Sequence, residues 1–375
     1  MLASSLLVFV FAFALAATFA SIALAFRRLT RRARPGIAPM PVSIVRPVSG
    51  LEPFSRLTLG SGFRLDHPDY ELLFCAHNAK DPVVPVVRAL MAEHPHVTAR
   101  LLIGDEGRSA NPKLDNCLKG WAAARHDWIV LADSNVEMPP DYLQRLFAAW
   151  RPNSGLVCSM PLGTRPDGFW AEVECAFLNG FQARWQYAAE AAGSGYAQGK
   201  SMLWNRRFLD NRGSLIALGQ EAAEDAAATK LVREAGTQVH LVDRPFPQPI
   251  GRRSWGDVWR RQARWARLRR VTFPALYLLE CFTSPLVATA GLAIVAPTPW
   301  FGLAALALCY GAEIGLVRRL GWQAGARILP AMLMRDLALP AIWLAGFVGR
   351  EVQWHGRTVP VARAAKSAAP AGAFP

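Results

Sequence analysis

Residues 128–137, W-I-V-L-A-D-S-N-V-E, carry the clearest sign of the fold. Five apolar or small residues lead directly into Asp133, and a polar cluster follows it. A continuous apolar run of this length, bounded by turn-forming residues, is typical of a strand buried on both faces of a parallel sheet. Ligands of open α/β sheets bind beyond the carboxyl ends of the strands, so Asp133 is placed to meet a ligand or a metal ion. A carboxylate there suits Mg²⁺ or Mn²⁺ bridged to phosphate oxygens, although an aspartate in such a turn is also commonly the cap of the next helix.

Predicted strands and helices alternate on both sides of this stretch. The other predicted strands are 42–46, 70–76, 97–103, 155–160 and 237–242, and the predicted helices are 82–93, 114–125, 139–150, 169–190, 221–234 and 254–270. Alternation of this kind indicates an α/β fold with a parallel, doubly wound sheet.

Both ends of the chain carry apolar segments long enough for a membrane. Residues 1–26 contain no charged residue and are followed by a basic, Pro-rich linker, 27–41, whose arginines come after the apolar stretch. This order predicts an uncleaved anchor with the arginines in the cytoplasm. Residues 273–350 contain two or three hydrophobic segments: 276–295, 300–317 and 332–348, of which the last could either span or be re-entrant. A small, Pro-rich tail, 351–375, ends the chain, and its last nine residues are predicted to be disordered.

The formal net charge of +14 could suggest nucleic acid, but the charge distribution argues against it. Eight arginines lie within residues 252–270, interleaved with three tryptophans, just before the next apolar segment. Basic residues mixed with tryptophan beside membrane spans fit an interface with anionic lipid, and no nucleic-acid-binding signature accompanies them. The six cysteines are scattered without metal-site spacing, so they are best explained as reduced structural thiols.

Several short motifs stand in an order that resembles the ceramide glucosyltransferases of glycosyltransferase family 21, which have the GT-A fold. They are V-S-I-V-R-P-V-S-G at 42–50, D-P at 81, N-P-K at 111–113, D-S-N at 133, A-E-D at 223–225, R-Q-A-R-W at 261–265 and Gln353-Trp354. The resemblance covers residues 42–356. It implies a cytosolic GT-A domain, 42–250, then an interfacial helix with the R-x-x-R-W motif, 251–272, and the membrane segments.

The resemblance also implies a role for each motif. Asp81 would hold the uracil or ribose end of a UDP-sugar, Lys113 and Arg261 would help bind this donor, and Asp133 would bind the divalent metal, Mn²⁺ or Mg²⁺. Asp225 would be the general base that activates the acceptor hydroxyl. Arg264 would offset charge on the departing diphosphate, and Trp265 would shape the pocket.

Alternatives remain for each of these residues. Asp81 could be a helix cap, Lys113 a solvated helix-start lysine, and Arg264 and Trp265 an interfacial anchor. Glu224 competes with Asp225 as the base, because adjacent helix residues point about 100° apart and only one can face the site well.

The sequence departs from the family pattern at two places. His77-Asn78-Ala79-Lys80 stands where the family tends to have acids, and Asn135 stands where a second Asp could ligate the metal. Two further small residues, Gly199 and Ser201, are expected to let a sugar lie against the backbone.

The function that the resemblance implies is inverting transfer of a hexose, glucose first, from a UDP-sugar to a membrane lipid hydroxyl, with ceramide as the expected acceptor. The expected location is multi-pass in a bacterial inner membrane, with the catalytic domain cytoplasmic and no nucleic acid as a partner. Two alternatives stay open: a hopanoid N-acetylglucosamine transferase, and a catalytically silent membrane scaffold that merely keeps the fold.

Overall fold

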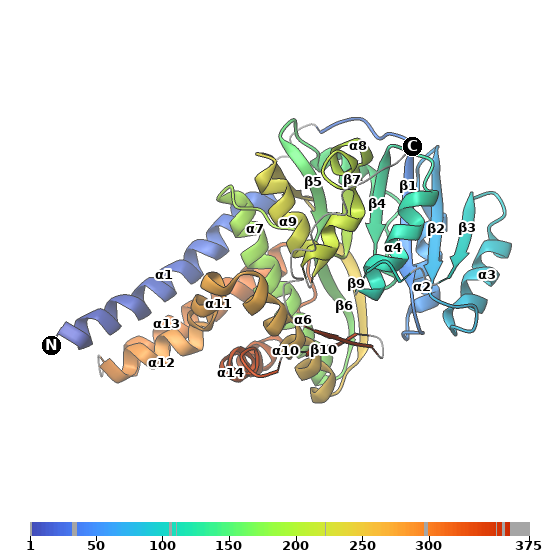
Figure 1. The fold of residues 1–375 in the computed structure, drawn as a ribbon. Helices are drawn as coiled ribbons and strands as arrows, with labels where there is room; N and C mark the ends of the chain where they lie inside the picture. The colour runs from blue at the N-terminus through green and yellow to red at the C-terminus, as the bar shows by residue number, and fades with distance from the viewer. Residues whose placement is uncertain are drawn as a thin grey trace.

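The computed structural model describes residues 2–31, 36–104, 107–109, 111–221, 223–295, 299–349, 351–354 and 357–360. A seven-stranded sheet with the strand order β3-β2-β1-β4-β7-β5-β8 forms its centre (Figure 1). The strands of this sheet are β1 Val42–Val48, β2 Tyr70–Ala76, β3 Ala99–Ile103, β4 Trp128–Ala132, β5 Ser154–Ser159, β7 Ser201–Asn205 and β8 Gln238–Leu241.

The helices of this domain and the one that follows it are α2 Ser55–Ser61, α3 Val83–Glu93, α4 Pro112–Ala123, α5 Tyr142–Ala149, α6 Phe169–Cys175, α7 Arg184–Ala191, α8 Arg206–Asp210, α9 Glu224–Glu234 and α10 Trp255–Thr272. Along β4, Ile129 and Leu131 belong to one hydrophobic core, whereas Val130 and Ala132 belong to the other. The predicted burial of this strand on both faces is therefore confirmed.

The sheet is mixed, so the prediction of a purely parallel sheet is wrong. β1 runs parallel to β2 and β4, but β7 runs antiparallel to its two neighbours, β4 and β5. The long helical segment of residues 169–191, made of α6, a π-helix at Ala176–Ala183 and α7, delivers the chain to β7 from the opposite end of the sheet. Apolar alternation does not encode strand direction, which is why the sequence did not reveal this reversal.

Besides β7, the sequence did not predict the strands β6 Pro161–Asp167 and β9 Phe246–Arg252. They pair in parallel as a separate two-stranded sheet. Prolines at 161, 166, 247 and 249 mask the strand pattern in the sequence. Such prolines are tolerated because each strand of a two-stranded sheet has a free edge that needs no N–H donor.

The strand order places Asp133 at a topological switch point. β1 and β4 are adjacent, whereas the chain runs from β1 to β2 and β3 on the other side. A crevice forms where the strand order reverses, at the carboxyl ends of the strands. Because β7 begins where β4 ends, the Asp133 N–H donates to the Lys200 carbonyl at 3.0 Å.

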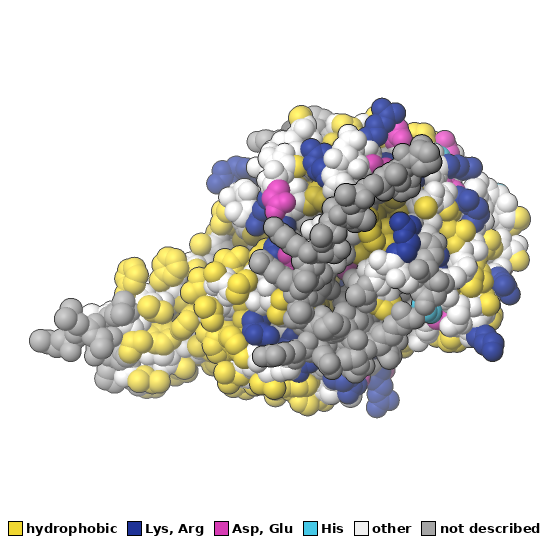
Figure 2. Space-filling model, in the orientation of Figure 1, with side chains coloured by type: hydrophobic (Ala, Val, Ile, Leu, Met, Phe, Trp, Pro, Cys, Tyr) yellow, Lys and Arg dark blue, Asp and Glu magenta, His cyan; other side chains and the backbone are white. Residues whose placement is uncertain are grey.

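Three helices in the part of the chain that the structure describes are long and apolar enough to cross a membrane: Leu7–Thr30 of α1 (Leu2–Thr30), Trp300–Arg319 of α13 (Pro299–Arg319) and α14 (Ile328–Ala345). The segment predicted as a span at 276–295 is not one straight helix. It forms α11 (Pro274–Glu280) and α12 (Pro285–Val295). The helical segment 274–283, which contains α11, is bent by 70° relative to the segment 285–294 of α12. In Figure 2, apolar side chains cover the arm in which α1, α12 and α13 project together from the rest of the protein.

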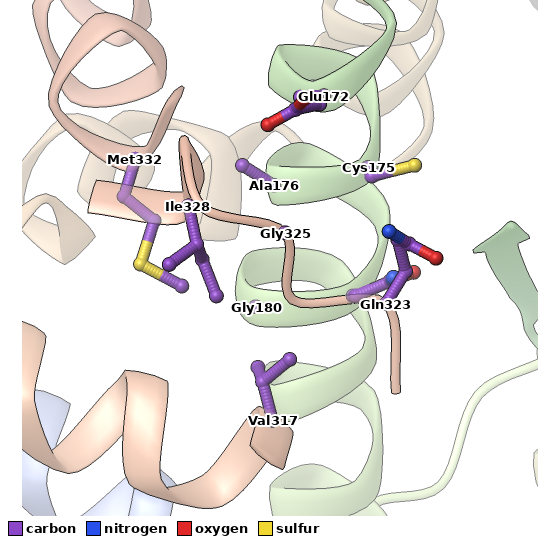
Figure 3. A pocket seen from close by; sticks show the side chains of 10 residues that line it. Glu172, Cys175, Ala176, Gly180, Val317, Gln323, Gly325, Ile328 and Met332 are labelled. Carbon is purple, nitrogen blue, oxygen red and sulfur yellow. The ribbon is translucent and has the colours of Figure 1, made fainter. Parts of the chain in front are cut away.

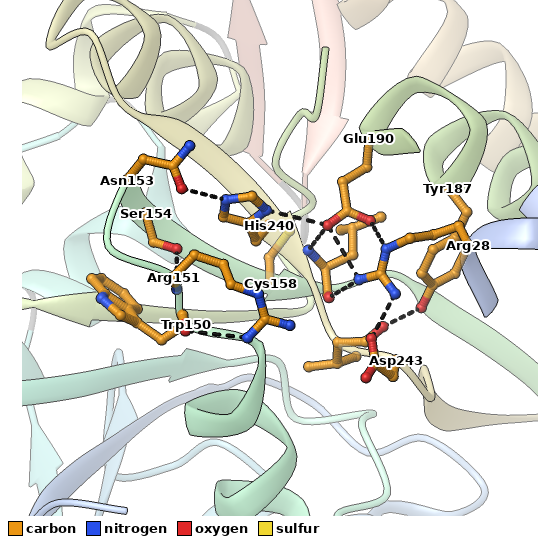
Figure 4. A network of polar contacts seen from close by, with 12 residues as sticks. Arg28, Trp150, Arg151, Asn153, Ser154, Cys158, Tyr187, Glu190, His240 and Asp243 are labelled. Atoms are coloured by element: carbon orange, nitrogen blue, oxygen red, sulfur yellow. Dashed lines mark hydrogen bonds and ion pairs between the residues drawn. The ribbon is translucent and has the colours of Figure 1, made fainter. Parts of the chain in front are cut away.

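Arg28, near the end of α1, attaches this helix to the sheet domain (Figure 4). Its guanidinium lies 2.6 Å from Glu190 on α7 and 2.6 Å from Asp243, and donates to the Leu241 carbonyl at 2.9 Å. His240 lies on the other side of Glu190, with Nδ1 3.4 Å from the carboxylate. The first membrane helix is therefore attached to the domain by charge as well as by apolar contact.

A buried group of charged residues joins α13 and α14 to the helical segment 169–191. Arg335 pairs with Glu313 and, at 2.8 Å, with Asp336, while Arg184 lies 3.4 Å from Glu313. All four side chains are essentially inaccessible to solvent. Beside them a small cavity of about 20 Å³, lined by residues of 172–180 and 317–332, has room for a single water molecule (Figure 3).

A hairpin of β10 (Glu351–Trp354) and β11 (Arg357–Pro360) follows the last membrane helix. The predicted disordered end of the tail, 367–375, lies outside the described residues, as do Arg32 and Arg34 of the basic linker.

Candidate active site

One large cavity of about 1480 Å³ opens at the carboxyl ends of β1 and β4. From Asp133 it passes the start of α9 and the length of α10, and it ends against α11 and α14. Its wall includes every candidate site residue: Asp81, Lys113, Asp133, Asp225, Arg261, Arg264 and Trp265. The tertiary structure thus brings together motifs that are spread over most of the chain.

The carboxylate of Asp133 lies between two lysines. Its Oδ1 is 2.6 Å from Lys113 Nζ, and its Oδ2 is 2.6 Å from Lys200 Nζ. Although burial opposes the charge, these two ammonium groups hold the pKa of Asp133 well below its usual range. The two lysines therefore favour the charged form of Asp133, and the N-cap residue of the next helix, α5, is Asp141 and not Asp133.

Lys113 is a partly buried residue of the site with protein partners, so the alternative of a solvated helix-start lysine is wrong. Asn111 caps α4 by accepting from the N–H groups of Lys113 and Leu114. This cap starts the helix so that Lys113 reaches Asp133, Glu224 Oε1 at 2.6 Å and the Gly199 carbonyl at 2.8 Å. Each of its three ammonium protons can thus be matched to an acceptor.

The two acids of the A-E-D motif have different surroundings. Glu224 is buried and is held by Lys113 and, at 3.1 Å, by the amide of Asn111. Asp225 lines the cavity and accepts from the Gly199 N–H at 3.2 Å. Burial and the neighbouring Glu224 charge raise the pKa of Asp225 to about 6. A carboxylate with that pKa suits proton transfer near neutral pH.

The two small residues near the site differ in their surroundings, because Gly199 lines the cavity whereas Ser201 lies below it in the core. A Cβ on Gly199 would meet Glu224 Oε1 at 2.7 Å and Lys113 Nζ at 3.0 Å, so the missing side chain accommodates this ion pair. Ser201 is fully buried and accepts from the Tyr142 hydroxyl at 2.9 Å. The expectation that Ser201 leaves room for a sugar is therefore wrong.

Asp81 lies at the rim formed by the β1 turn. Its Oδ1 accepts from the N–H of Gly50 and from that of Val83, each at 2.9 Å. It therefore holds the 47–50 turn and also accepts from the first N–H of α3, although the N-cap residue of this helix is Pro82 and not Asp81. Its carboxylate lines the cavity as well, so the donor-binding role stays a prediction.

Helix α10 presents Arg261, Arg264 and Trp265 to the cavity. Ser254 and Asp257 form a capping box that fixes the start of this helix. Arg261 pairs with Glu174 at 3.1 Å, and its guanidinium carbon lies 4.6 Å from the centre of the Trp265 ring. Burial and the Arg261 charge lower the pKa of Arg264. The helix therefore contributes positive charge to the cavity wall.

Two site residues were missed in the sequence. Lys200 bridges Asp133 and Asn135, with Nζ 3.1 Å from the Asn135 amide oxygen. Arg46 is fully buried and donates to the carbonyls of Asp133, Ser134 and Val136 at 3.0–3.2 Å. An arginine inside an otherwise apolar predicted strand was the signal for Arg46, because a buried guanidinium needs several acceptors. No local pattern marked Lys200.

The site around Asp133 offers a divalent ion few oxygen ligands. Within the described ranges, no group of three or more His, Cys, Asp and Glu side chains could hold a metal ion. Mg²⁺ in proteins is commonly bound by one or two carboxylates together with substrate phosphates. Asp133 and the Asn135 amide oxygen therefore fit part of a metal shell that the diphosphate of a nucleotide would complete.

Comparison with known proteins agrees with this geometry. The sequence model of glycosyl transferase family 21 matches residues 7–366. The chain belongs to glycosyltransferase family 21. Family 21 relatives include Ceramide glucosyltransferase 1 of Caenorhabditis elegans, 28% identical over 271 residues, which are 71% of this chain and 58% of that protein. Ceramide glucosyltransferase 3 of the same organism is 24% identical over 84% of this chain and 71% of its own length. This family 21 chain thus spans less than two thirds of the first of these relatives.

Among solved structures, the mannosyltransferase of Pyrobaculum calidifontis in complex with GDP-Man and Mn²⁺ is similar with a TM-score of 0.51 and 17% identity. The match covers 91% of this chain and 97% of that one. It confirms the GT-A fold that the motifs of family 21 imply.

Proposed function

We propose that the chain transfers glucose from UDP-glucose to the hydroxyl of a membrane lipid, with ceramide as the acceptor and inversion at the anomeric carbon. One observation carries the proposal: the cavity that holds Asp133 and Asp225 continues without a break to the apolar helices α11 and α14. On α11, Leu276 and Leu279 are 66% and 62% exposed, as expected for a surface that faces lipid. The relatives named ceramide glucosyltransferases support this acceptor.

In the proposed reaction Asp225 takes the proton from the acceptor hydroxyl. The acceptor oxygen forms a bond to the anomeric carbon as the bond between that carbon and the diphosphate oxygen breaks, and UDP leaves with the electron pair. A single displacement of this kind inverts the configuration. Arg264 and the neighbouring cations offset the charge that grows on the diphosphate.

The donor would lie along the polar end of the cavity. Asp81 and the 47–50 turn would contact the uridine, and Lys113, which pairs with Asp133 and Glu224, would orient these two acids near the diphosphate. Arg261 would bind the donor, and Trp265 would line the acceptor side of the cavity. A divalent ion, Mn²⁺ or Mg²⁺, held by Asp133 and Asn135 would supply further positive charge to the leaving group.

The proposed location is a bacterial inner membrane with the GT-A domain, 42–250, and the interfacial helix, 251–272, on the cytoplasmic side. Arg27 and Arg28 end α1, and Arg318 and Arg319 end α13. Basic residues at these helix ends favour the cytoplasm for the connected domain.

The test is transfer of radiolabelled sugar to lipid by membranes that contain the wild type or Asp225→Asn. UDP-glucose, UDP-galactose and UDP-N-acetylglucosamine serve as donors, with ceramide or a hopanoid as the acceptor. Asp141→Asn is the matched control, because Asp141 lies on the surface and pairs with Arg145. We expect glucosylated ceramide from the wild type and the control only. Label in a hopanoid from UDP-N-acetylglucosamine would correct the substrates, and no transfer from any donor would favour a catalytically silent scaffold.

A further inference from the structure

Lys200 lies where the strand β7 begins, beside the proposed metal ligand. We propose that Lys200 binds the donor diphosphate through its own positive charge, so that nucleotide binding persists without a divalent ion. This inference rests on the proposed function, since it assumes a nucleoside diphosphate donor.

The position of Lys200 follows from the antiparallel pairing of β4 and β7. Ala132 is the partner of Ser201 in this pair, and the Asp133 N–H donates to the Lys200 carbonyl. The strand pairing and this hydrogen bond therefore hold the backbone of Lys200 next to Asp133. A side chain held at a strand end is preorganised for a ligand at the switch point.

The ammonium group of Lys200 stands between the two side chains that would ligate a metal ion. It lies 2.6 Å from Asp133 Oδ2 and 3.1 Å from Asn135 Oδ1. A positive charge is therefore already present at the place that a cation shared by these two residues would take. Asp133 is bracketed by two lysines, and Lys113 also pairs with Glu224, so Lys200 depends on Asp133 alone for an anionic partner among these residues.

The two lysines differ in how many hydrogen-bond acceptors the protein offers to their ammonium groups. Lys113 has three acceptors in the protein, namely Asp133, Glu224 and the Gly199 carbonyl. The hydrogen bonds of Lys200 within the described residues go to two acceptors, Asp133 and Asn135, whereas an ammonium group can donate three. Lys200 also lines the large cavity. Lys200 can therefore donate to a ligand without giving up a partner.

A diphosphate is the ligand chemistry that this arrangement fits. Charge-assisted hydrogen bonds from ammonium groups to phosphate oxygens are strong and short. Arg261 and Arg264 on α10 border the same cavity and add to the positive potential. The nucleoside itself gains nothing from Lys200, so the effect should depend on the number of phosphates.

The test measures UDP and UMP binding by calorimetry on the purified full-length chain, in EDTA and in Mn²⁺. We expect wild type to bind UDP in EDTA, and Lys200→Gln to weaken that binding by about tenfold or more while affecting UMP less. Lys200→Arg should restore most of the loss. Lys230→Gln is the matched control, because Lys230 is also partly buried and paired with a carboxylate, Glu221, outside the cavity wall.

A second variant separates the lysine from the metal. Asp133→Asn removes the anion that Lys200 neutralises, so UDP binding in EDTA should be kept or strengthened while the gain from Mn²⁺ is lost. UDP binding by Lys200→Gln equal to that of wild type in EDTA would overturn the proposal, as would wild-type binding that requires Mn²⁺. Either of these results would leave the proposed transfer reaction unaffected. If the wild type bound UDP neither in EDTA nor in Mn²⁺, the proposed function would be overturned as well.

Discussion

Lys113 Nζ and Glu224 Oε1 form a buried ion pair at 2.6 Å, and this pair distinguishes the two acids of the A-E-D motif. Glu224 is engaged in holding Lys113 against Asp133, whereas Asp225 lines the cavity beside the Gly199 N–H. This difference supports the proposal of Asp225 as the base, and we propose a positioning role for Glu224.

The two acids should respond differently to amide substitution. Asp225→Asn should lower kcat by about 10²–10⁴-fold with little change in UDP affinity. Glu224→Gln removes one charge of a buried pair, so it should lower the melting temperature and weaken donor binding. Kinetics and thermal unfolding of both variants check this, and a Glu224→Gln protein with normal stability and no turnover would reverse the assignment.

The activity should depend on pH through Asp225. Because the pKa of this carboxyl is raised to about 6, kcat/KM should fall as the pH drops through about 6, where the base becomes protonated. The same shift means that the folded protein binds this proton more tightly than the unfolded chain. Its contribution to stability is therefore lost as pH rises from about 4 to about 6.

Asp225→Asn removes that proton equilibrium, so the variant should be at least as stable as wild type at neutral pH. Unfolding curves of both proteins across this pH range check the prediction, with Asp141→Asn as the control. An acidic limb of the rate profile centred near pH 4, the ordinary range of an aspartate, would exclude the raised pKa.

Gly199→Ala should disable the site without touching the hydrophobic cores. Its Cβ would lie 2.7 Å from Glu224 Oε1 and 3.0 Å from Lys113 Nζ, so the ion pair would have to shift. We expect weaker UDP binding and a large loss of kcat. Gly315→Ala in α13 is the control, because a Cβ there meets nothing within 4 Å and its activity should be normal.

Arg46→Met should be strongly destabilising. The guanidinium of Arg46 donates to carbonyls at Thr58, Asp133, Ser134 and Val136, and each buried carbonyl left without a donor costs about 1–3 kcal/mol. The surface variant Arg56→Met removes only an exposed pair with Glu93 and should cost about 1 kcal/mol or less. Chemical unfolding of the two proteins compares these losses, and equal values would show that Arg46 does not hold the Asp133 loop.

Arg335→Met should weaken the attachment of α14. Breaking a buried ion pair by removing one partner costs about 3–5 kcal/mol, and Arg335 contacts both Glu313 and Asp336. We expect less folded protein after detergent extraction, measured by size-exclusion chromatography. Arg318→Met, at an exposed helix end, should give as much folded protein as wild type after extraction. If Arg335→Met gives as much as well, the buried charged group contributes little to the attachment of α14.

Local patterns in the sequence were sufficient for the elements that bury apolar surface and for the membrane segments. The run before Asp133 predicted β4, because burial on both faces requires continuous apolar residues. The apolar segments at 1–26, 300–317 and 332–348 overlap the helices Leu7–Thr30, Trp300–Arg319 and Ile328–Ala345, which are suited to a membrane, since length and hydropathy alone decide that property. The motifs also predicted which residues would line the cavity.

The tertiary structure decided what depends on neighbours that are distant in the chain. Lys200 reaches Asp133 across 67 positions, and Arg46 reaches its loop across 87. The Arg46 contact requires that β1 and β4 be neighbours, and the Lys200 contact requires the reversed direction of β7. Apolar alternation encodes neither property. The choice between Glu224 and Asp225 as the proposed base likewise depends on where the fold places Lys113. The chemistry of a carboxylate is set by the charges and the burial around it, which the sequence does not show.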